Sequence, residues 1–367
     1  MSRVVVGMSG GVDSSVAAAL LVEAGHDVIG ITMHLAGSSS RCCSLEDADD
    51  ARRVAERLGI PYFVANYTDA FRREVMEPFA DAYLAGETPI PCVACNKRFK
   101  FDLLLARARA LGAAQVATGH YARVSVDPET ERYVLRRARD PQKDQSYFLY
   151  NLSQEQLACT LFPLGELDKE SVRDHARRLG LATAEKPESQ EICFVPDGDY
   201  ARVVAALRPD ALPGEGEIVD ETGAHLGRHG GVHHFTVGQR RGLGLPAAGK
   251  RYVTRLDAEN NRVVVGDGTS LAHRRATAAH VSWTDGVPPS GDLRIQVRVR
   301  HRHEPMPATL SRAQAPSDAR SNGPSNGDGE LVRLDFDEPI RAVTPGQAAV
   351  FYQGDRVLGG GTIRDAG

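Results

Sequence analysis

Hydrophobic positions in the first third of the chain alternate between short β-branched runs and longer segments with helical spacing. The short runs predict strands at 3–7, 27–33, 62–65 and 115–118. The longer segments predict helices at 13–23 and 96–111, and a further helix that begins near Ser44 and Asp47. Because strands that alternate with helices form parallel sheets covered on both faces, this part is expected to be an α/β domain.

The pattern changes at 208–216, where proline and glycine cluster. Beyond this point short alternating strands and many glycines replace the helical periodicity, which favours small β-barrels. We therefore expect an α/β domain at 1–207, a β-rich central domain at 208–275 and a C-terminal β-barrel domain at 276–367. Residues 313–329 are rich in Ser, Asn, Gly, Pro and Asp, so a disordered loop is expected there.

The composition is that of an ordinary globular protein, with 42% hydrophobic and 25% charged residues over 367 positions. The formal net charge of −4 gives no support for non-specific binding to nucleic acid. We find no signal peptide and no apolar stretch of the roughly 20 residues that cross a bilayer, so we expect a cytoplasmic protein with no membrane partner. Structural disulfides are rare in that compartment, and the six cysteines are expected to bind metal, react or pack.

The segment 4–15 has the sequence Val-Val-Val-Gly-Met-Ser-Gly-Gly-Val-Asp-Ser-Ser, which predicts a strand, a tight turn and a helix. Adjacent glycines let the backbone approach a ligand closely, and the first N–H groups of a helix suit a phosphate. The alternative is a turn whose glycines serve geometry alone, but the full Ser-Gly-Gly-Val-Asp-Ser string favours phosphate binding. The segment has no lysine, so it is not the common P-loop. The expected nucleotide-binding residues are Gly7, Met8, Ser9, Gly10, Gly11, Val12, Asp13 and Ser14.

Two further segments carry cysteines in polar surroundings. Cys95 lies at the expected start of helix 96–111 and shortly precedes Lys97 and Lys100; a helix start and nearby cations both favour the thiolate. Cys193 follows Ser-Gln-Glu-Ile in an expected loop. A thiolate is a candidate nucleophile. Taken alone, each cysteine is better explained as a buried, inert side chain.

In combination these segments carry a family resemblance. The loop at 7–14 resembles the PP-loop of ATP pyrophosphatases, enzymes that transfer AMP to an oxygen of the substrate and release pyrophosphate. With the cysteine segments in this order, the chain resembles the bacterial tRNA-specific 2-thiouridylases almost from end to end. Further strings that carry the resemblance are Gly-His-Tyr at 119–121, Lys-Asp-Gln-Ser-Tyr at 143–147, Gly-Gln-Arg at 238–240, Thr-Pro-Gly-Gln at 344–347 and Leu-Gly-Gly-Gly at 358–361.

The resemblance implies a PP-loop adenine nucleotide hydrolase-like domain and an ATP-dependent sulfurtransferase that places sulfur at position 2 of the wobble uridine in tRNA. It implies that Met33 and Gly119 contact ATP beside the loop, and that Asp13 helps to arrange Mg²⁺. Cys193 would receive sulfur as a persulfide from a cysteine desulfurase or a sulfur-relay protein. Cys95 would then release that sulfur and leave a transient, catalytic Cys95–Cys193 disulfide. The substrates would be tRNAs of the Lys, Glu and Gln type.

The tRNA contacts implied by the resemblance fall at five places in the chain. They are Ile90, Pro91, Cys92, His120, Lys143, Asp144, Gln145, Arg300, His301 and Gln347. The stretch 294–302 gives an independent indication, because Arg or Gln occupies every even position and a strand would place them on one face. Such a row suits an RNA backbone. The alternative is a solvated edge strand whose arginines serve solubility.

Several residues depart from the family pattern. Ile90 stands where Asn is expected, His301 where Tyr is expected, and Cys92 at a position that is often Asp. Cys42 and Cys43 have no firm role. Because Cys92 creates a C-x-x-C with Cys95, an alternative is that Cys92, Cys95 and Cys193 hold an iron–sulfur cluster that carries sulfide. A zinc site is weaker, since a second C-x-x-C is missing.

Two alternatives concern the whole protein. One is a PP-loop synthetase that acts on a small molecule and needs neither the paired cysteines nor the arginine-rich strand. The other is a non-catalytic tRNA-binding or redox protein, which would release no pyrophosphate when tRNA is added.

Overall fold

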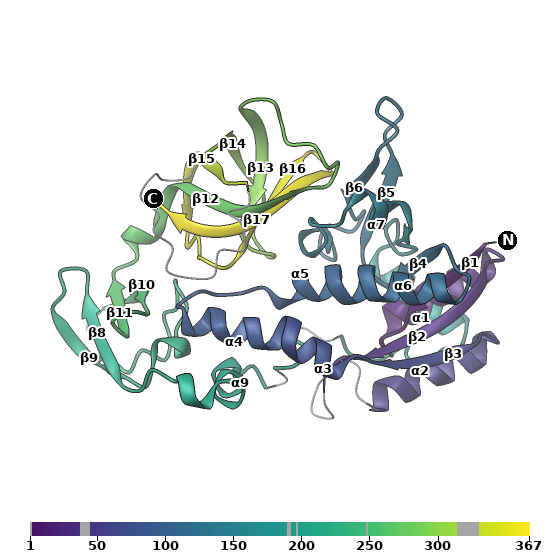
Figure 1. The fold of residues 1–367 in the computed structure, drawn as a ribbon, viewed down its shortest axis with the longest axis horizontal. Helices are drawn as coiled ribbons and strands as arrows, with labels where there is room; N and C mark the ends of the chain where they lie inside the picture. The colour runs from purple at the N-terminus through teal and green to yellow at the C-terminus, as the bar shows by residue number, and fades with distance from the viewer. Residues whose placement is uncertain (1, 37–44, 189–191, 196, 247–248, 314–329) are drawn as a thin grey trace.

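A computed structural model describes residues 2–36, 45–188, 192–195, 197–246, 249–313 and 330–367 of the chain (Figure 1). Three features singled out in the sequence lie wholly or mainly outside these residues: Cys42 and Cys43, the first part of the Ser-Gln-Glu-Ile-Cys-Phe segment, and the loop at 313–329, of which only Ala313 is described. The described chain has an α/β part at the N-terminus, then a small β-sheet, then a β-barrel.

The α/β part is built on a five-stranded parallel sheet with the strand order β3-β2-β1-β4-β7. Two strands have the predicted bounds, β1 (Arg3–Gly7) and β4 (Gln115–Thr118), and two run one residue further than predicted, β2 (Asp27–His34) and β3 (Tyr62–Asn66). The edge strand β7 (Thr160–Leu161) is short. The predicted fold class is thus confirmed for this part.

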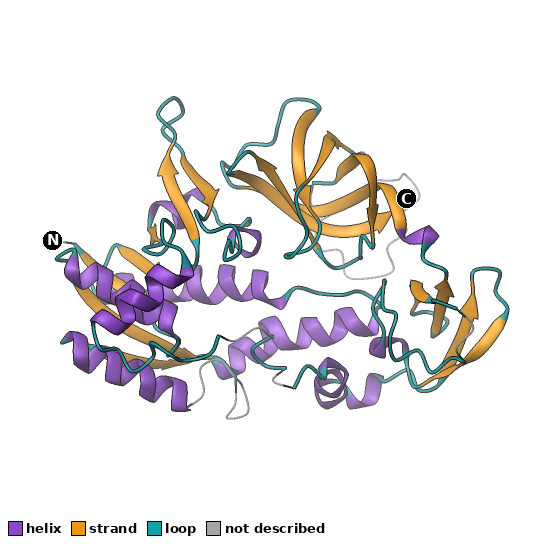
Figure 2. Cartoon of the chain, turned by 180° about the vertical axis from the view of Figure 1, so that it is seen from behind, coloured by secondary structure: helices purple, strands orange, loops and turns teal. Residues whose placement is uncertain are grey.

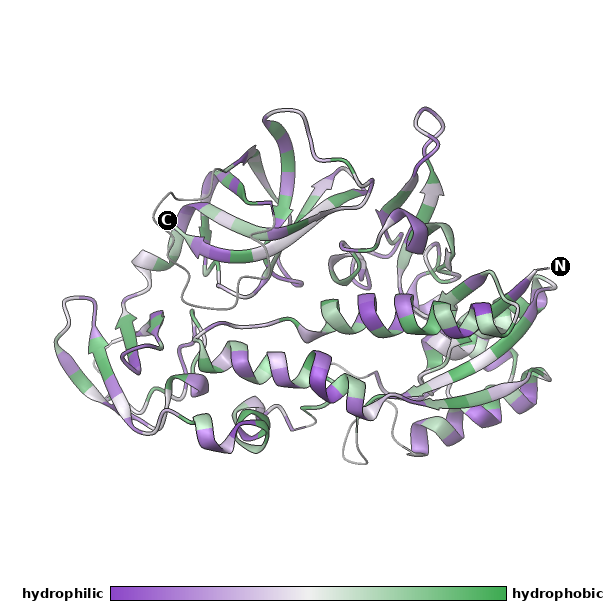
Figure 3. Cartoon of the chain, viewed as in Figure 1, coloured by the Kyte–Doolittle hydropathy of each residue, from purple (hydrophilic) through white to green (hydrophobic). Residues whose placement is uncertain are grey.

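Helices cover both faces of this sheet (Figure 2). On β1, Val4 and Val6 point to one face and pack with α1 (Val12–Glu23), α2 (Leu45–Leu58) and α8 (Lys169–Arg178). Val5 points to the other face, among aromatic side chains that include Phe71 and Phe99. Strands buried on both faces carry nearly continuous apolar runs, and β1 and β2 are mainly hydrophobic along their length (Figure 3).

The helix predicted at 96–111 begins earlier than expected. α5 (Pro91–Cys95), η2 (Asn96–Leu103) and α6 (Leu104–Ala110) follow one another as one long helix (Figure 1). Pro91 occupies the first turn, where its missing N–H costs no hydrogen bond. Cys95 therefore lies one turn inside the helix and not at its start. The η2 segment has the wider π-helical geometry, which in other proteins is frequent at functional sites.

The other helices and turns of the α/β part connect the sheet to the later domains. They are α3 (Thr68–Phe71), the π-helical η1 (Arg72–Met76), α4 (Glu77–Leu84), the 3₁₀ turn η3 (Ser146–Phe148), α7 (Gln154–Ala158), α9 (Tyr200–Leu207) and the 3₁₀ turn η4 (Pro209–Ala211). The hairpin β5 (Ala122–Val126) and β6 (Tyr133–Arg137) leaves the α/β part and reaches the barrel, where Arg136 pairs with Arg356.

The second part is a four-stranded sheet with the order β10-β11-β8-β9. Its strands are β8 (Gly216–Asp220), β9 (His225–His229), β10 (Tyr252–Asp257) and β11 (Arg262–Gly266), and the turn η5 (Val232–His234) lies between β9 and β10. This confirms a β-rich centre. The turn η6 (Thr269–Leu271) leads into the third part.

The third part is an antiparallel barrel of six strands in the order β12-β15-β14-β13-β16-β17, which the pairing of β12 with β17 closes. Its strands are β12 (Ala272–Trp283), β13 (Leu293–Arg298), β14 (Met306–Arg312), β15 (Val332–Arg341), β16 (Ala348–Gln353) and β17 (Arg356–Ala366). Closure removes the sheet edges that would otherwise pair with other chains, and it confirms the predicted C-terminal barrel.

A buried ion pair joins the barrel to the α/β part. Arg298 Nη1 lies 3.3 Å from Asp144 Oδ2, and the two side chains are 6% and 0% exposed. Asp144 also accepts hydrogen bonds from the backbone N–H groups of Ala138 and Ser146 and from Arg137. The Arg298 guanidinium lies 5.5 Å from the ring centre of Tyr352. Asp144 is therefore an internal residue, and its assignment as a tRNA contact stays a prediction.

Loss of the Arg298 guanidinium is expected to destabilise the chain by about 3–5 kcal/mol, because Asp144 would stay buried without its cation from the barrel. Thermal unfolding of Arg298→Met measures the effect as a lower melting temperature. Arg294→Met is the matched control on the same strand: its ion pair with Asp337 is exposed and is expected to contribute less than about 1 kcal/mol. Equal melting temperatures for the two variants would contradict the prediction.

Candidate active site

A cavity of ≈ 410 Å³ opens at the carboxyl end of the parallel sheet. This is the edge at which open α/β sheets bind their ligands. Three segments that are far apart in the sequence line it: the glycine loop after β1, the first two turns of the long helix from Pro91, and the turn that carries Cys193. The cavity thus brings together the expected ATP site and both expected catalytic cysteines.

The glycine loop is held in shape by its own serines. The Ser14 hydroxyl accepts a hydrogen bond from the Ser9 N–H at 3.1 Å and donates one to the Gly11 carbonyl. Ser15 also donates to the Gly11 carbonyl, at 2.8 Å. No side chain caps the start of α1, since Gly11 stands at the cap position. The free N–H groups of this helix start therefore face the cavity, as phosphate binding requires.

Close backbone packing explains two of the glycines. Gly10 has a φ of +73°, and a Cβ there would lie 2.1 Å from the Asp47 carbonyl oxygen. A Cβ on Gly119 would lie 2.6 Å from the Ser14 nitrogen. In contrast, a Cβ on Gly11 would meet only the Ser9 hydroxyl, at 3.6 Å. Gly10 and Gly119 are thus needed to build the loop, while the space at Gly11 faces the cavity and is open to a ligand.

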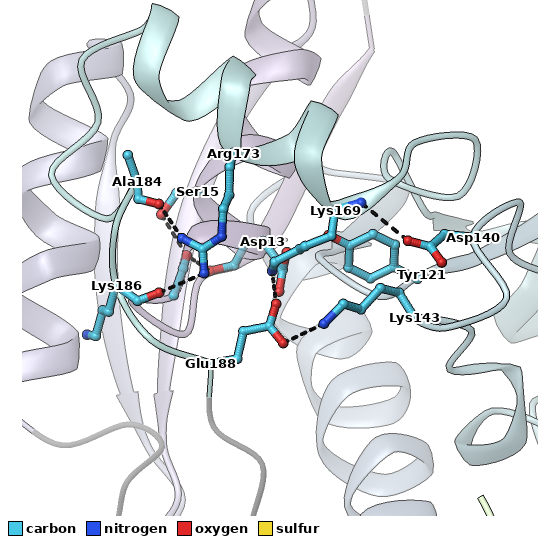
Figure 4. A network of polar contacts seen from close by, with 12 residues as sticks. Asp13, Ser15, Tyr121, Asp140, Lys143, Lys169, Arg173, Ala184, Lys186 and Glu188 are labelled. Carbon is cyan, nitrogen blue, oxygen red and sulfur yellow. Dashed lines mark hydrogen bonds and ion pairs between the residues drawn. The ribbon is translucent and has the colours of Figure 1, made fainter. Parts of the chain in front are cut away.

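A network of ion pairs connects Asp13 of the loop with Lys169, Glu188 and Lys143 (Figure 4). Asp13 Oδ1 accepts hydrogen bonds from the Tyr121 hydroxyl and from Lys169 Nζ, both at 2.7 Å. Lys169 also pairs with Glu188 at 2.5 Å, and Glu188 pairs with Lys143 at 2.7 Å. Burial alone would raise the pKa of Glu188, but hydrogen bonds from Lys143 and Lys169 lower it, so this carboxylate is charged.

Of the lysines at this site, sequence reasoning identified Lys143, as a tRNA contact, but neither Lys169 nor Lys186. Lys169 comes from α8, and Lys186 pairs with Asp47 at 2.7 Å and with Asp50 at 2.6 Å. The loop lacks the lysine of the common P-loop, yet the fold brings Lys169 from a distant segment to its aspartate. The one available signal was that Lys186 and Glu188 directly precede the Ser-Gln-Glu-Ile-Cys-Phe string that carries the family resemblance.

Cys95 and Cys193 both line the cavity. Cys95 is 9% exposed on the long helix, whereas Cys193 is half-buried. The Cys193 turn is fixed by a hydrogen bond from the Val195 N–H to the Ile192 carbonyl and by Phe194, whose ring packs edge-on against Phe71 and Phe79. The loop position predicted for Cys193 is confirmed. Cys95 is more enclosed and lies further inside its helix than the sequence predicted.

His120 lies at the cavity wall between two polar partners. Its Nδ1 is 2.6 Å from the Thr118 hydroxyl, and its Nε2 is 3.3 Å from Lys100 Nζ. Burial lowers the pKa of His120 well below its usual range, and the charge of Lys100 adds to the effect. The imidazole is therefore neutral near pH 7, and it accepts a hydrogen bond from Lys100 at the wall that also carries the cysteines.

The residues implied as tRNA contacts divide into two groups. Pro91, Cys92, His120, Lys143 and Gln145 line the cavity, together with the implied ATP contacts Met33 and Gly119. Ile90 packs against the core beside them, as the residue that precedes the helix.

The C-terminal residues implied as tRNA contacts lie where the barrel meets the α/β part. Gln347 donates a hydrogen bond to the Thr88 carbonyl, and Arg300 donates to the Thr344 hydroxyl at 2.7 Å. The His301 ring lies 4.5 Å from that of Phe148. None of these residues lines the cavity.

The predicted row of arginines on one strand face is only partly correct. Arg294 and Gln296 are exposed, but Arg298 on the same strand is buried against Asp144. Arg298 lies on the same face of the strand as Arg294 and Gln296, but the α/β part covers that end of the face, and a single-strand pattern does not contain this contact.

Metal binding by the cysteines finds no geometric support in the described part of the chain. Cys92, Cys95 and Cys193 line one cavity, but among the described residues no group of three or more His, Cys, Asp or Glu side chains is arranged to hold a metal ion. Within the same residues, no helix combines the length and the apolar character that a membrane crossing requires.

Three family models match the chain. They are described as a tRNA methyl transferase HUP domain at residues 2–197, a tRNA methyl transferase PRC-barrel domain at 207–267 and an aminomethyltransferase beta-barrel domain at 273–363. Their order follows the α/β, β-rich and barrel parts of the structure.

Full-length relatives are more specific than the domain descriptions. The tRNA-specific 2-thiouridylase MnmA of Solibacter usitatus is 50% identical over 378 residues, which span 98% of each chain. That of Acidobacterium capsulatum is 48% identical over 379 residues, which span 99% of each chain. Among solved structures, a 4-thiouridine synthetase–RNA complex with bound ATP is 17% identical, with a TM-score of 0.38 over 57% of this chain and 53% of the other, which is too distant to carry an argument.

Proposed function

Because this chain belongs to the family of tRNA-specific 2-thiouridylases, we propose that it catalyses the ATP-dependent 2-thiolation of the wobble uridine in tRNA. One observation carries the proposal: a phosphate-binding loop and two cysteines open onto a single cavity. Neither feature alone would distinguish this reaction, since the loop serves many adenylating enzymes. Together they supply a way to activate an oxygen and a way to replace it with sulfur.

The first step is activation of the uracil 2-oxo group. The oxygen attacks the α-phosphorus of ATP, and pyrophosphate leaves. The N–H groups at the start of α1 and the hydroxyls of Ser9 and Ser14 are the groups that would hold the departing phosphates. Met33 and Gly119 line the same wall, as the family resemblance requires for ATP contacts.

The second step replaces the activated oxygen. The outer sulfur of a Cys193 persulfide attacks carbon 2 of the ring, and AMP leaves with the oxygen. The Cys95 thiolate then attacks Cys193 Sγ, which breaks the sulfur–sulfur bond and leaves the outer sulfur on the ring. The two cysteines end as a disulfide, so two electrons have passed to the transferred sulfur. A cellular reductant must restore both thiols before the next turnover.

A magnesium ion fits the chemistry of this wall. Asp13 is the carboxylate of the loop itself, and its Oδ1 already accepts hydrogen bonds from Tyr121 and Lys169. When bound, magnesium would supply positive charge to the phosphates of ATP. Asp13 would then share its charge between the ion and Lys169.

The partners follow from the chemistry. We propose that the substrates are tRNAs of the Lys, Glu and Gln type, and that Cys193 is loaded by a cysteine desulfurase or a sulfur-relay protein. Lys143 and Gln145 at the cavity mouth support contact with the tRNA near its target base. We propose that Arg300, His301 and Gln347 contact a more distant part of the tRNA from the barrel.

Methyl transfer, which two of the domain descriptions name, fits the site less well. Transfer of a methyl group needs neither a loop that binds ATP while its phosphates are cleaved nor two cysteines beside the reacting base. The three-cysteine cluster is likewise less well supported than the persulfide, because the described residues contain no group arranged for a metal.

The test is mass spectrometry of tRNA nucleosides after incubation of the enzyme with tRNA, ATP and a cysteine desulfurase with cysteine. 2-Thiouridine is expected only when all are present, together with pyrophosphate released in proportion to the product. Pyrophosphate release that is independent of tRNA would instead favour a synthetase for a small molecule. Methylated uridine without sulfur would overturn the proposal.

A further inference from the structure

A third cysteine shares the cavity with the two catalytic candidates. Cys92 lies in the first turn of the long helix, directly after Pro91, and Cys95 lies one turn further along the same helix. Both line the cavity that Cys193 also lines, from a distant segment of the chain. The three cysteines therefore line one cavity, although Cys92 has no part in the sulfur transfer described above.

The helix brings Cys92 and Cys95 within bridging distance. Residues three apart in an α-helix have Cα atoms about 5 Å apart, from the rise and radius of the helix. This lies inside the range of roughly 4.4–6.8 Å in which two cysteines form a disulfide. The helix start also favours the thiolate form of Cys92, because the positive end of its dipole lies there.

The two cysteines differ in access. Cys95 is 9% exposed, whereas Cys92 is half-buried nearer the helix start. The acidic side chains of the cavity lining are each matched by a lysine: Asp13 by Lys169, Asp47 by Lys186, and Glu188 by Lys143 and Lys169. The cation that lines the cavity from the cysteine helix itself is Lys100. Cys92 is therefore the more accessible of the two cysteines, and a lysine lines the cavity from the same helix.

We propose that Cys92 resolves the disulfide that sulfur transfer leaves behind. The Cys92 thiolate attacks Cys95 Sγ of the Cys95–Cys193 disulfide. A Cys92–Cys95 bond forms, the Cys95–Cys193 bond breaks, and Cys193 leaves as a thiolate. The exchange conserves electrons and needs no further reagent. An external dithiol reductant then reduces the Cys92–Cys95 bond, which yields both thiols and the oxidised reductant.

In this scheme Cys193 becomes free before the external reductant acts. Exchange frees Cys193 to accept the next sulfur while the oxidised pair waits at the more accessible end of the helix. The short tether between Cys92 and Cys95 gives the exchange a high effective concentration. The inference rests on the proposed function, because it requires that sulfur transfer leaves a Cys95–Cys193 disulfide.

The experiment maps the disulfide after one turnover. The full chain is loaded with one equivalent of inorganic polysulfide, freed from excess, and mixed with tRNA and ATP in the absence of a reductant. Samples are quenched in acid over time, alkylated and digested with trypsin. Arg73 and Lys97 bound one tryptic peptide that holds both Cys92 and Cys95, whereas Cys193 falls in another. An internal disulfide and a cross-link between peptides are therefore distinguished by mass.

In the wild-type chain the cross-linked peptides are expected to appear first and then to convert into the internal Cys92–Cys95 disulfide, with Cys193 becoming alkylated. In Cys92→Ser the cross-link should persist without conversion. Cys159→Ser is the matched control, because that half-buried cysteine does not line the cavity, and it should convert as the wild type does.

The outcomes separate the two proposals. A cross-link that persists in the wild-type chain while 2-thiouridine forms would overturn the role of Cys92 and leave the proposed function intact. An internal disulfide that appears before any cross-link, or without ATP, would also overturn it. Absence of both 2-thiouridine and any ATP-dependent disulfide would count against the proposed function itself.

Discussion

Gly119→Ala is expected to reduce tRNA-dependent pyrophosphate release by about 100-fold, the order of loss that follows a displacement of about 1 Å at reacting groups. The added Cβ would lie 2.6 Å from the Ser14 nitrogen and 2.7 Å from the Asp13 carbonyl carbon. Both atoms are backbone at the start of α1, so the loop and not a flexible side chain must move. The N–H groups proposed to hold the phosphates would move with it.

Two other glycines sharpen this prediction. Gly291→Ala adds a Cβ that meets nothing within 4 Å, so its activity should equal that of the wild type. In Gly11→Ala the added Cβ would contact only the Ser9 hydroxyl, at 3.6 Å, so this variant should fold normally. Its methyl group would project into the cavity, so ATP binding should weaken. Initial rates of pyrophosphate release over a range of ATP concentrations measure all three. Full activity in Gly119→Ala would show that the close approach at Ser14 does not position the phosphates.

Much of the α/β part was predictable because its signals are local. A strand such as 3–7 is buried on both faces of a parallel sheet, so an unbroken β-branched run identifies it. The start of the helix at Pro91 was missed, since a proline before a helical pattern indicates either a break or the first turn. Because of this error, Cys95 was predicted to lie at the start of the helix, whereas Cys92 lies there and Cys95 lies one turn further along.

The parts that sequence reasoning missed depend on contacts between distant segments. Lys169 follows Asp13 by more than a hundred residues, and no local pattern says that the two meet. The family resemblance placed Asp144 near tRNA, and the alternation along 294–302 placed Arg298 in a row expected to face RNA. They are buried because each neutralises the other across the boundary between two domains, which neither segment reveals alone.

The same physics explains why the chemistry was easier to predict than the tRNA surface. Phosphate binding needs a short loop at a helix start, and that loop is contiguous in the sequence. A surface for folded RNA is assembled from several domains, so its residues are fixed by how the domains pack. Arg300 and Gln347 illustrate this, since both make hydrogen bonds to other segments at the junction between barrel and α/β part.

The cysteines remain the most direct test of the mechanism, and the two should fail in different ways. Cys193→Ala is expected to accept no persulfide and to form no 2-thiouridine. Cys95→Ala should still carry one extra sulfur atom after incubation with the desulfurase, because Cys193 is intact, yet it should also form no 2-thiouridine. Intact-protein mass spectrometry measures the sulfur on the enzyme, and nucleoside mass spectrometry measures the product.

The two cysteines are expected to fail differently because they differ in exposure and in the element that carries them. Cys193 sits half-buried on a turn that Phe194 anchors, while the enclosed Cys95 lines the same cavity from the helix. Sulfur loading should therefore need only the first, and sulfur release should need both. Cys159→Ala, outside the cavity, is the control and should retain loading and product. A Cys95→Ala chain that thiolates tRNA at the wild-type rate would remove Cys95 from the mechanism and, with it, the disulfide that Cys92 is proposed to resolve.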